Sequence, residues 1–408
     1  MSEESNTYIV KTSFFGLLTA LTTISFKILI TNKTKDYDTN PTSHPYLICL
    51  LFFIGKSINL IIFFFSDASE KTEEELPLPK LTPNVSSNEI SLPKIDFSNF
   101  KGDYTLNKSK YPSSKRLPLS MSITLLPSFL HYISVLLKCY ALSFINTGLY
   151  QFIFMILTLN TFTIEFYNKT NTLTKQTIIS YVIAHVCIII GIIYYLIINE
   201  QHQCMSIVLL CISNVLHCVV LYMNTIVIMP TTITTASQLY GTEGLIALVI
   251  GLIVLICSCN IYCVDNAFTR ITFCGGHNTI EQFKSFFSNA NYDSGTRYLI
   301  MCVFVICVFI YYYSEQGIKV YSMYHSNTAM CVVNLIIGCL VWALFTFVEG
   351  FGIVKEQFRV VDVVIGVIMF IALLMGGFVF ELPMLASQQG NNGVIKEAAE
   401  EEEDERDW

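Results

Sequence analysis

Six charged side chains lie within or at the ends of long apolar stretches, where a charge is unusual. They are Lys27, Lys56, Glu165, Glu243, Glu315 and Glu349. A charge at the centre of a bilayer costs about 2.5–3.5 kcal/mol on insertion scales, so each such residue is a functional candidate. We expect one of the first three glutamates to neutralise one of the lysines, and some of these groups to change protonation during a functional cycle. The plainer alternative is a structural ion pair or a position at the membrane surface.

Two histidines and a run of tyrosines also lie inside apolar stretches. His185 and His217 could each relay protons or hydrogen-bond a neighbouring helix. We count His185 among the candidate coupling residues. The alternative is a histidine of the packed interior whose hydrogen bonds are satisfied by neighbouring helices. The run Tyr311-Tyr312-Tyr313 covers half the circumference of a helix, so at least one ring should face the interior and could line a cavity.

A short pattern occurs twice at a fixed offset of 181 residues. Lys138-Cys139-Tyr140 … Asn146-Thr147 returns as Lys319-Val320-Tyr321 … Asn327-Thr328, and five apolar stretches separate the two copies. An odd number of spans gives the copies opposite orientations in the membrane, as in the inverted repeats of many secondary transporters. The candidate substrate-binding residues are the repeat positions and two polar neighbours: Lys138, Tyr140, Asn146, Gln151, Lys319, Tyr321, Asn327 and Asn334. Hydrogen bonding between helices explains the amides equally well.

Motifs of known catalytic and metal sites are missing from the sequence. It contains no HExxH, GxSxG or P-loop motif and no carboxylates clustered at helical spacing. Cys257, Cys259 and Cys263 are close together but lack nearby histidine or cysteine partners, which makes a poor zinc site. We therefore expect no enzyme, no metal and no cofactor.

The composition is that of a membrane protein. Apolar residues make up 53% of the chain and charged residues 13%, about half the usual charged fraction of a soluble domain. Such a chain has little polar surface to offer to water, so lipid must surround most of it. The net charge of −7 argues against binding to nucleic acid.

Apolar stretches long enough to cross a bilayer, about 20 residues each, recur along the chain. We place ten spans near residues 8–30, 46–65, 119–142, 147–167, 176–198, 205–228, 241–264, 297–317, 328–348 and 360–380. They divide the chain into helices 1 and 2 (1–65), helices 3 to 5 (119–200), helices 6 and 7 (201–264) and helices 8 to 10 (297–382). The fold class is therefore an all-α membrane protein.

Three polar segments interrupt or follow these spans. Residues 66–118 are rich in Ser, Pro, Glu and Lys and are expected to form a disordered cytosolic loop. Residues 265–296 form a shorter loop on the lumenal side, and 383–408 form an acidic cytosolic tail. Because Lys and Arg are most numerous in 66–118, the positive-inside rule places both termini in the cytosol.

Several short motifs resemble those of the solute carrier 35 family. They are His44-Pro45-Tyr46-Leu47 with Phe53-Ile54-Gly55, Tyr140-Ala141-Leu142 with Tyr150-Gln151, and Gly241-Thr242-Glu243-Gly244-Leu245. The F subfamily, in the branch around member six, is the most similar part of that family, which belongs to the drug/metabolite transporter superfamily. The resemblance implies two inverted five-helix repeats and a carrier of the endomembrane system, with nucleotide-sugar carriers among its relatives.

The chain departs from this branch at charged positions. Lys56 stands where the branch has a glutamate, and Phe154-Met155 stands where it has an Arg-Gly pair. In the ninth helix, Met330, Asn334 and Ile337 occupy the positions of an arginine, an aspartate and an arginine. Losing three cations weakens the case for a phosphate-bearing substrate, because a buried phosphate needs charged donors.

These observations predict a secondary transporter for a small organic solute, nucleotide-sugar-like or another metabolite. The alternative is a transport-inactive relative that acts as a membrane scaffold through the loop 66–118 or the acidic tail. The expected partners are the lipid bilayer and a small-molecule substrate, with a homodimer as an option and no nucleic acid. The choice among Golgi, lysosomal and other vesicular membranes stays open.

Overall fold

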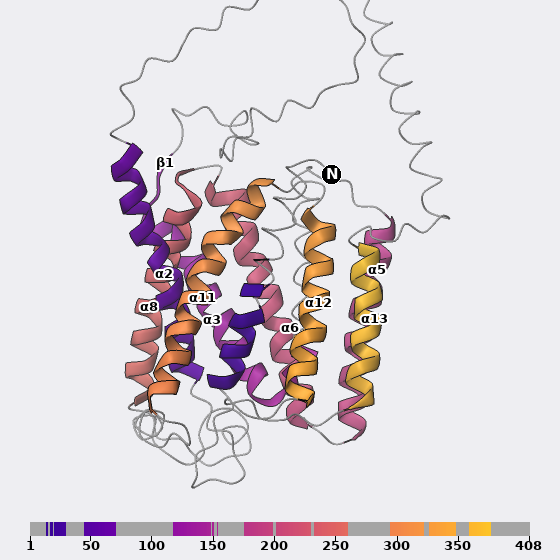
Figure 1. Ribbon diagram of the computed structural model, residues 1–408. Helices are drawn as coiled ribbons and strands as arrows, with labels where there is room; N and C mark the ends of the chain where they lie inside the picture. The colour runs from indigo at the N-terminus through magenta and orange to yellow at the C-terminus, as the bar shows by residue number, and fades with distance from the viewer. Residues whose placement is uncertain are drawn as a thin grey trace, which may run out of the picture.

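The computed structural model describes the helices of the chain and a short strand pair (Figure 1). The described residues are 14, 17–18, 20–29, 45–70, 117–147, 149–150, 153, 175–198, 201–229, 232–259, 294–321, 326–347 and 359–376. The expected loops 66–118 and 265–296 and the acidic tail lie almost wholly outside this part of the chain.

The described residues form an almost entirely helical structure. After a first helical segment, Ala20–Leu29, the elements are α2 (Pro45–Glu70), α3 (Met121–Phe144), α5 (Lys175–Ile197), α6 (Gln201–Tyr222), the π-helical η4 (Met223–Ile228), α8 (Ala236–Cys259), α11 (Ser294–Tyr321), α12 (Ser326–Phe347) and α13 (Val360–Gly376). The strands β1 (Leu117–Pro118) and β2 (Thr232–Ile233) pair in parallel, with Leu117 opposite Thr232.

Five helices are long and apolar enough to cross a membrane. They are Pro45–Phe65, Met121–Phe144, Ile178–Ile197, Gln203–Tyr222 and Ala236–Cys257. Shorter apolar helices, at Ala20–Leu29, Tyr298–Tyr313, Gly338–Phe347 and Val360–Ala372, lie within four more of the expected spans. The remaining expected span, 147–167, falls mostly outside the described residues. The chain is therefore a multi-pass membrane protein, and the total of ten spans stays a prediction.

The outer surface of α5 shows why lipid must surround the bundle. Val182, Val186, Ile189 and Ile193 follow one another at helical spacing, and each is about half exposed. A continuous apolar stripe of this kind is costly in water, and in a bilayer it contacts acyl chains instead.

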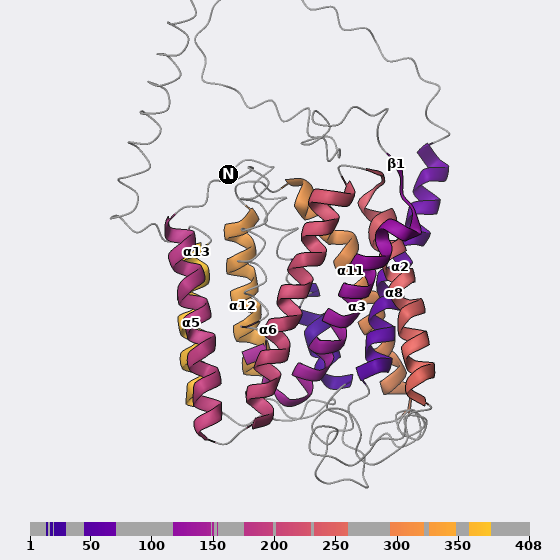
Figure 2. The ribbon, with the colours of Figure 1, turned by 180° about the vertical axis from the view of Figure 1, so that it is seen from behind.

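Three helices pack around α2 and α3 to form the centre of the bundle. α2 packs against α8 and α11, and α3 packs against α6 and α8, whereas α5 and α13 lie side by side at one edge (Figures 1 and 2). Glycines permit the close approach of α2 and α8. A Cβ atom at Gly244 would lie 2.7 Å from the Ser57 backbone nitrogen, so only glycine fits there.

Candidate functional site

Glu243 of α8 is the centre of a buried ion-pair network. Its Oε1 atom lies 2.8 Å from Lys56 Nζ of α2 and 2.5 Å from His131 Nδ1 of α3. Its Oε2 atom accepts a hydrogen bond of 3.0 Å from the Asn224 side-chain amide, which η4 supplies. Glu243 is fully buried, and Lys56 and His131 are each 1% exposed. Both carboxylate oxygens therefore have donors in the interior of the bundle.

Two aromatic rings complete the surroundings of Lys56. Its Nζ atom lies 4.6 Å from the centroid of the Tyr312 ring and 5.5 Å from that of Tyr240. A buried cation is stabilised over such ring faces. The Tyr312 hydroxyl is also 3.2 Å from His131 Nε2, so α11 joins the network through both the ring and the hydroxyl of one side chain.

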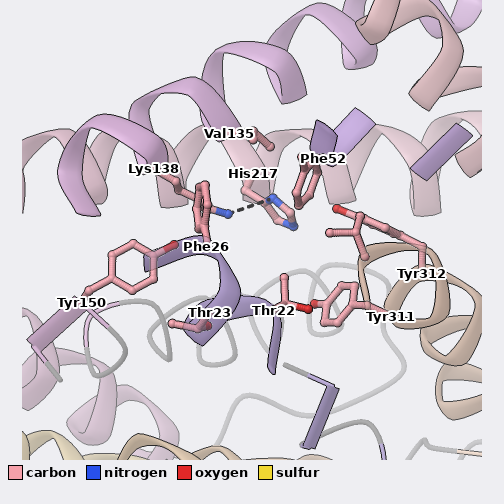
Figure 3. Close-up of a pocket in the computed structure, with 11 residues that line it drawn as sticks. Thr22, Thr23, Phe26, Phe52, Val135, Lys138, Tyr150, His217, Tyr311 and Tyr312 are labelled. Atoms are coloured by element: carbon pink, nitrogen blue, oxygen red, sulfur yellow. Dashed lines mark hydrogen bonds between the residues drawn. The ribbon is translucent and has the colours of Figure 1, made fainter. Parts of the chain in front are cut away.

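A cavity lies directly beside this network. It is lined by Thr22, Thr23, Phe26, Phe52, Val135, Lys138, Tyr150, His217, Val308, Tyr311 and Tyr312. Figure 3 shows Lys138 and His217 next to each other, with Thr22, Thr23 and Tyr311 across from them. Tyr312 belongs to both the cavity wall and the network, and the rings of His131 and His217 meet edge to face with centroids 5.1 Å apart.

A second buried polar cluster lies on the α5 and α13 side of the bundle. Asp362 accepts a 2.5 Å hydrogen bond from the Asn146 side-chain amide and another from the Tyr195 hydroxyl. The guanidinium of Arg359 lies 5.6 Å from the Tyr195 ring centroid. These hydrogen bonds link the turn after α3, which contains Asn146, to Tyr195 of α5 and Asp362 of α13.

Lys27 has a local role that the sequence did not suggest. Its Nζ atom donates hydrogen bonds to the carbonyls of Leu142 (2.8 Å) and Ile145 (3.0 Å) at the end of α3. A cation at this position satisfies terminal carbonyls and complements the negative end of the helix dipole. A glutamate was expected to neutralise either Lys27 or Lys56, and the ion pair with Glu243 is formed by Lys56.

The predicted site residues are distributed over several places. Lys56 and Glu243 form an ion pair, and Lys138 lines the cavity, where its Nζ atom lies 3.4 Å from His217 Nδ1. Tyr140 is buried away from the cavity wall with its ring against Tyr46, 6.4 Å between centroids. His185 is half-buried on α5.

Other predicted positions cannot be placed in the site. Asn146 donates a hydrogen bond to Asp362 and is not among the described residues that line the cavity, so its role in substrate binding stays a prediction. The structure gives only the helix for Glu315, Lys319 and Tyr321 (α11) and for Asn327 and Asn334 (α12), and Gln151, Glu165 and Glu349 lie outside the described residues.

Sequence reasoning missed polar residues of both clusters, among them His131, Asn224 and Asp362. His131 lies in the middle of α3, so a third histidine lies inside an apolar stretch besides His185 and His217. The expected span 119–142 already contained His131, and its depth could have been read from that range. Asp362 lies in the first turn of α13, where an acidic residue is ordinary in any helix, so its type gave no signal.

Fold and site define the class of the protein as a multi-pass membrane protein with a buried ion-pair network beside a cavity. No protein-family model matches the chain, and no curated protein matches it significantly. The resemblance to the solute carrier 35 family therefore stays a prediction.

Proposed function

We propose that the protein is a secondary transporter that moves a small organic solute across an endomembrane by alternating access. The observation that carries the proposal is the buried network of Lys56, His131 and Glu243 against the wall of a cavity. Charges at membrane depth are costly, and they are retained where substrates or ions pass. A purely structural ion pair has no need of a neighbouring cavity.

The imidazole of His131 gives the network two arrangements. Lys56 can only donate hydrogens and the ionised Glu243 can only accept them, so Nδ1 bonds to one of them at a time. When Nδ1–H donates to Glu243, Nε2 accepts from the Tyr312 hydroxyl. When Nδ1 accepts from Lys56, Nε2–H donates to the Tyr312 oxygen. A solute that forms a hydrogen bond with the Tyr312 hydroxyl in the cavity would therefore favour one of these two arrangements. Through the His131 ring it would change the hydrogen bonding of Lys56 and Glu243.

Helix packing supports two structurally related halves. An offset of 181 residues carries α3 onto residues 302–325, which overlap α11, and α5 onto residues 356–378, which overlap α13. If α2 and α8 are the second helices of the two halves, the contact of α2 with α11 corresponds to that of α8 with α3. Each of the packed pairs α2 with α8 and α5 with α13 then consists of two corresponding helices, one from each half. Both pairs would pack across the axis that relates the two halves.

These correspondences favour the inverted plan of two five-helix repeats. We extend the proposal to ten spans, with both termini cytosolic, and to a relationship with the drug/metabolite transporters. In that plan the cavity opens alternately to the two sides as the halves rock against each other. The glycine contacts between α2 and α8 provide the close, smooth surface that such a motion requires.

Uptake into proteoliposomes tests the function. Purified protein would be screened with organic anions, neutral metabolites, nucleotide sugars and organic cations, with and without a pH gradient. Saturable uptake of one class is expected. Folded protein that carries no solute of the panel would refute the proposal.

Tyr312→Phe tests the role of the network in the same assay. The change keeps the ring over Lys56 and removes the hydroxyl that meets His131, so a lower uptake rate is expected with little loss of stability. Tyr313→Phe is the matched control, because Tyr313 is the next residue of α11 and is half exposed on its outer face. Equal uptake by both variants would exclude the Tyr312–His131 contact from the transport cycle.

A further inference from the structure

We propose that the cavity binds a small organic anion, namely a single ring or a short apolar chain with one carboxylate. The inference deepens the proposed function, because it names the substrate class of that same site. It rests on three properties of the cavity: its size, the charge at one end and the apolar character of the rest.

The size of the cavity limits the ligand to about one ring. The volume of the cavity is about 70 Å³. One water needs about 10–15 Å³ by this measure, so the cavity holds on the order of five waters. A cavity of about 150 Å³ takes up one benzene molecule, so a space of about 70 Å³ sets a single small ring as the upper limit. A nucleotide sugar is several times larger than this space.

One end of the cavity is built to receive an acidic group. Among the described lining residues, Lys138 is the one lysine or arginine, and none of them is acidic. Its Nζ atom lies 3.4 Å from His217 Nδ1, so an ammonium and an imidazole are presented together. A carboxylate placed there would accept charge-assisted hydrogen bonds. An organic cation of the same shape would meet the lysine with like charge.

The remainder of the cavity suits an apolar body. Phe26, Phe52, Val135 and Val308 supply aromatic and aliphatic surface. The Phe26 ring is held in place by stacking on Phe304, with centroids 5.5 Å apart. The Thr22 hydroxyl already donates to the Leu18 carbonyl at 2.8 Å, which leaves fewer donors for a polar ligand. A sugar with many hydroxyls would therefore lose more hydrogen bonds to water than this wall returns.

Binding of three compounds of equal shape would test the charge preference. Benzoate, benzamide and benzylamine have the same ring with a negative, neutral or positive substituent. Their affinities would be measured by isothermal titration calorimetry on the full chain in nanodiscs. Benzoate is expected to bind about tenfold or more tightly than benzamide, as for hydrogen bonds to charged groups, and benzylamine the most weakly.

Two variants locate the binding in the cavity. Lys138→Met should lower the benzoate affinity about tenfold or more and leave that of benzamide unchanged. Val135→Phe fills the cavity one turn before Lys138 and should weaken both ligands. Tyr132→Phe is the control, because Tyr132 is a buried residue of the same helix outside the lining residues. Lys138→Arg, which should retain most of the preference, separates a loss of charge from a failure to fold.

The outcomes distinguish this inference from the transport function. Equal binding of benzoate and benzamide, or benzoate binding that survives Lys138→Met, would overturn the anion site. Saturable uptake of a neutral or cationic solute without benzoate binding would overturn it as well, while the transporter stands. Lys138-dependent binding without flux of any solute would support the site and refute the transporter.

Discussion

The effect on stability of removing the charge of Lys56 or of Glu243 should depend on whether the other charge is still present. At 2.8 Å their attraction is about 6 kcal/mol for an effective dielectric constant of 20, before the cost of desolvating both groups. Removal of one partner leaves a buried charge uncompensated, which typically costs about 3–5 kcal/mol. We therefore expect Glu243→Gln and Lys56→Met each to lower the free energy of unfolding by about that amount. Both changes keep the size of the side chain.

The double variant is the decisive measurement. With both charges removed, no uncompensated ion remains, so Lys56→Met with Glu243→Gln should cost at least about 1.5 kcal/mol less than the sum of the single changes. The free energies would be measured by denaturant titration in detergent micelles, with helix content followed by circular dichroism. Lys27→Met combined with Glu243→Gln is the control cycle, and it should be additive because Lys27 bonds to carbonyls of α3. An additive result for Lys56 and Glu243 would refute the reasoning.

Two further predictions concern packing and the second polar cluster. Gly244→Ala should cost about 1–3 kcal/mol in free energy of unfolding, because its Cβ meets the backbone of α2. Gly191→Ala, whose Cβ meets a flexible methyl group at 3.0 Å, should cost less than half as much, and equal costs would contradict the close-approach argument. Asp362→Leu leaves the Asn146 amide and the Tyr195 hydroxyl without their acceptor, and should cost at least about 2 kcal/mol in the same titration, with Asp362→Asn in between. A neutral effect of Asp362→Leu would show that the cluster contributes nothing to stability.

The helices were predictable from the sequence because a bilayer fixes their length and composition. The expected span 119–142 corresponds to α3 (Met121–Phe144), and 176–198 corresponds to α5 (Lys175–Ile197). The tyrosine run was also interpreted correctly, since Tyr311 and Tyr312 line the cavity and Tyr313 faces outward.

The partners of the charged residues could not be predicted in the same way. Each residue turns a helix by about 100°, so a small error in register changes which side chain faces inward. Asn224 lies in the first turn of the π-helical η4, where the turn per residue differs from that of an α-helix, so its sequence neighbourhood does not indicate that its amide reaches Glu243. Which helix meets α2 depends on packing between segments far apart in the chain.

The distance along the chain between Lys56 and Glu243 has a consequence for biosynthesis. Roughly 190 residues separate them, and a ribosome adding about 5–20 residues per second needs on the order of 10–40 s to make that length. During this interval the helix with Lys56 enters the bilayer before its counter-ion exists. The apolar remainder of Pro45–Phe65 must offset the insertion cost of the lysine, or a chaperone of the insertion machinery must shield it. If a chaperone shields the lysine, arrest of translation before Glu243 should leave α2 bound to that machinery, and release should coincide with the synthesis of α8.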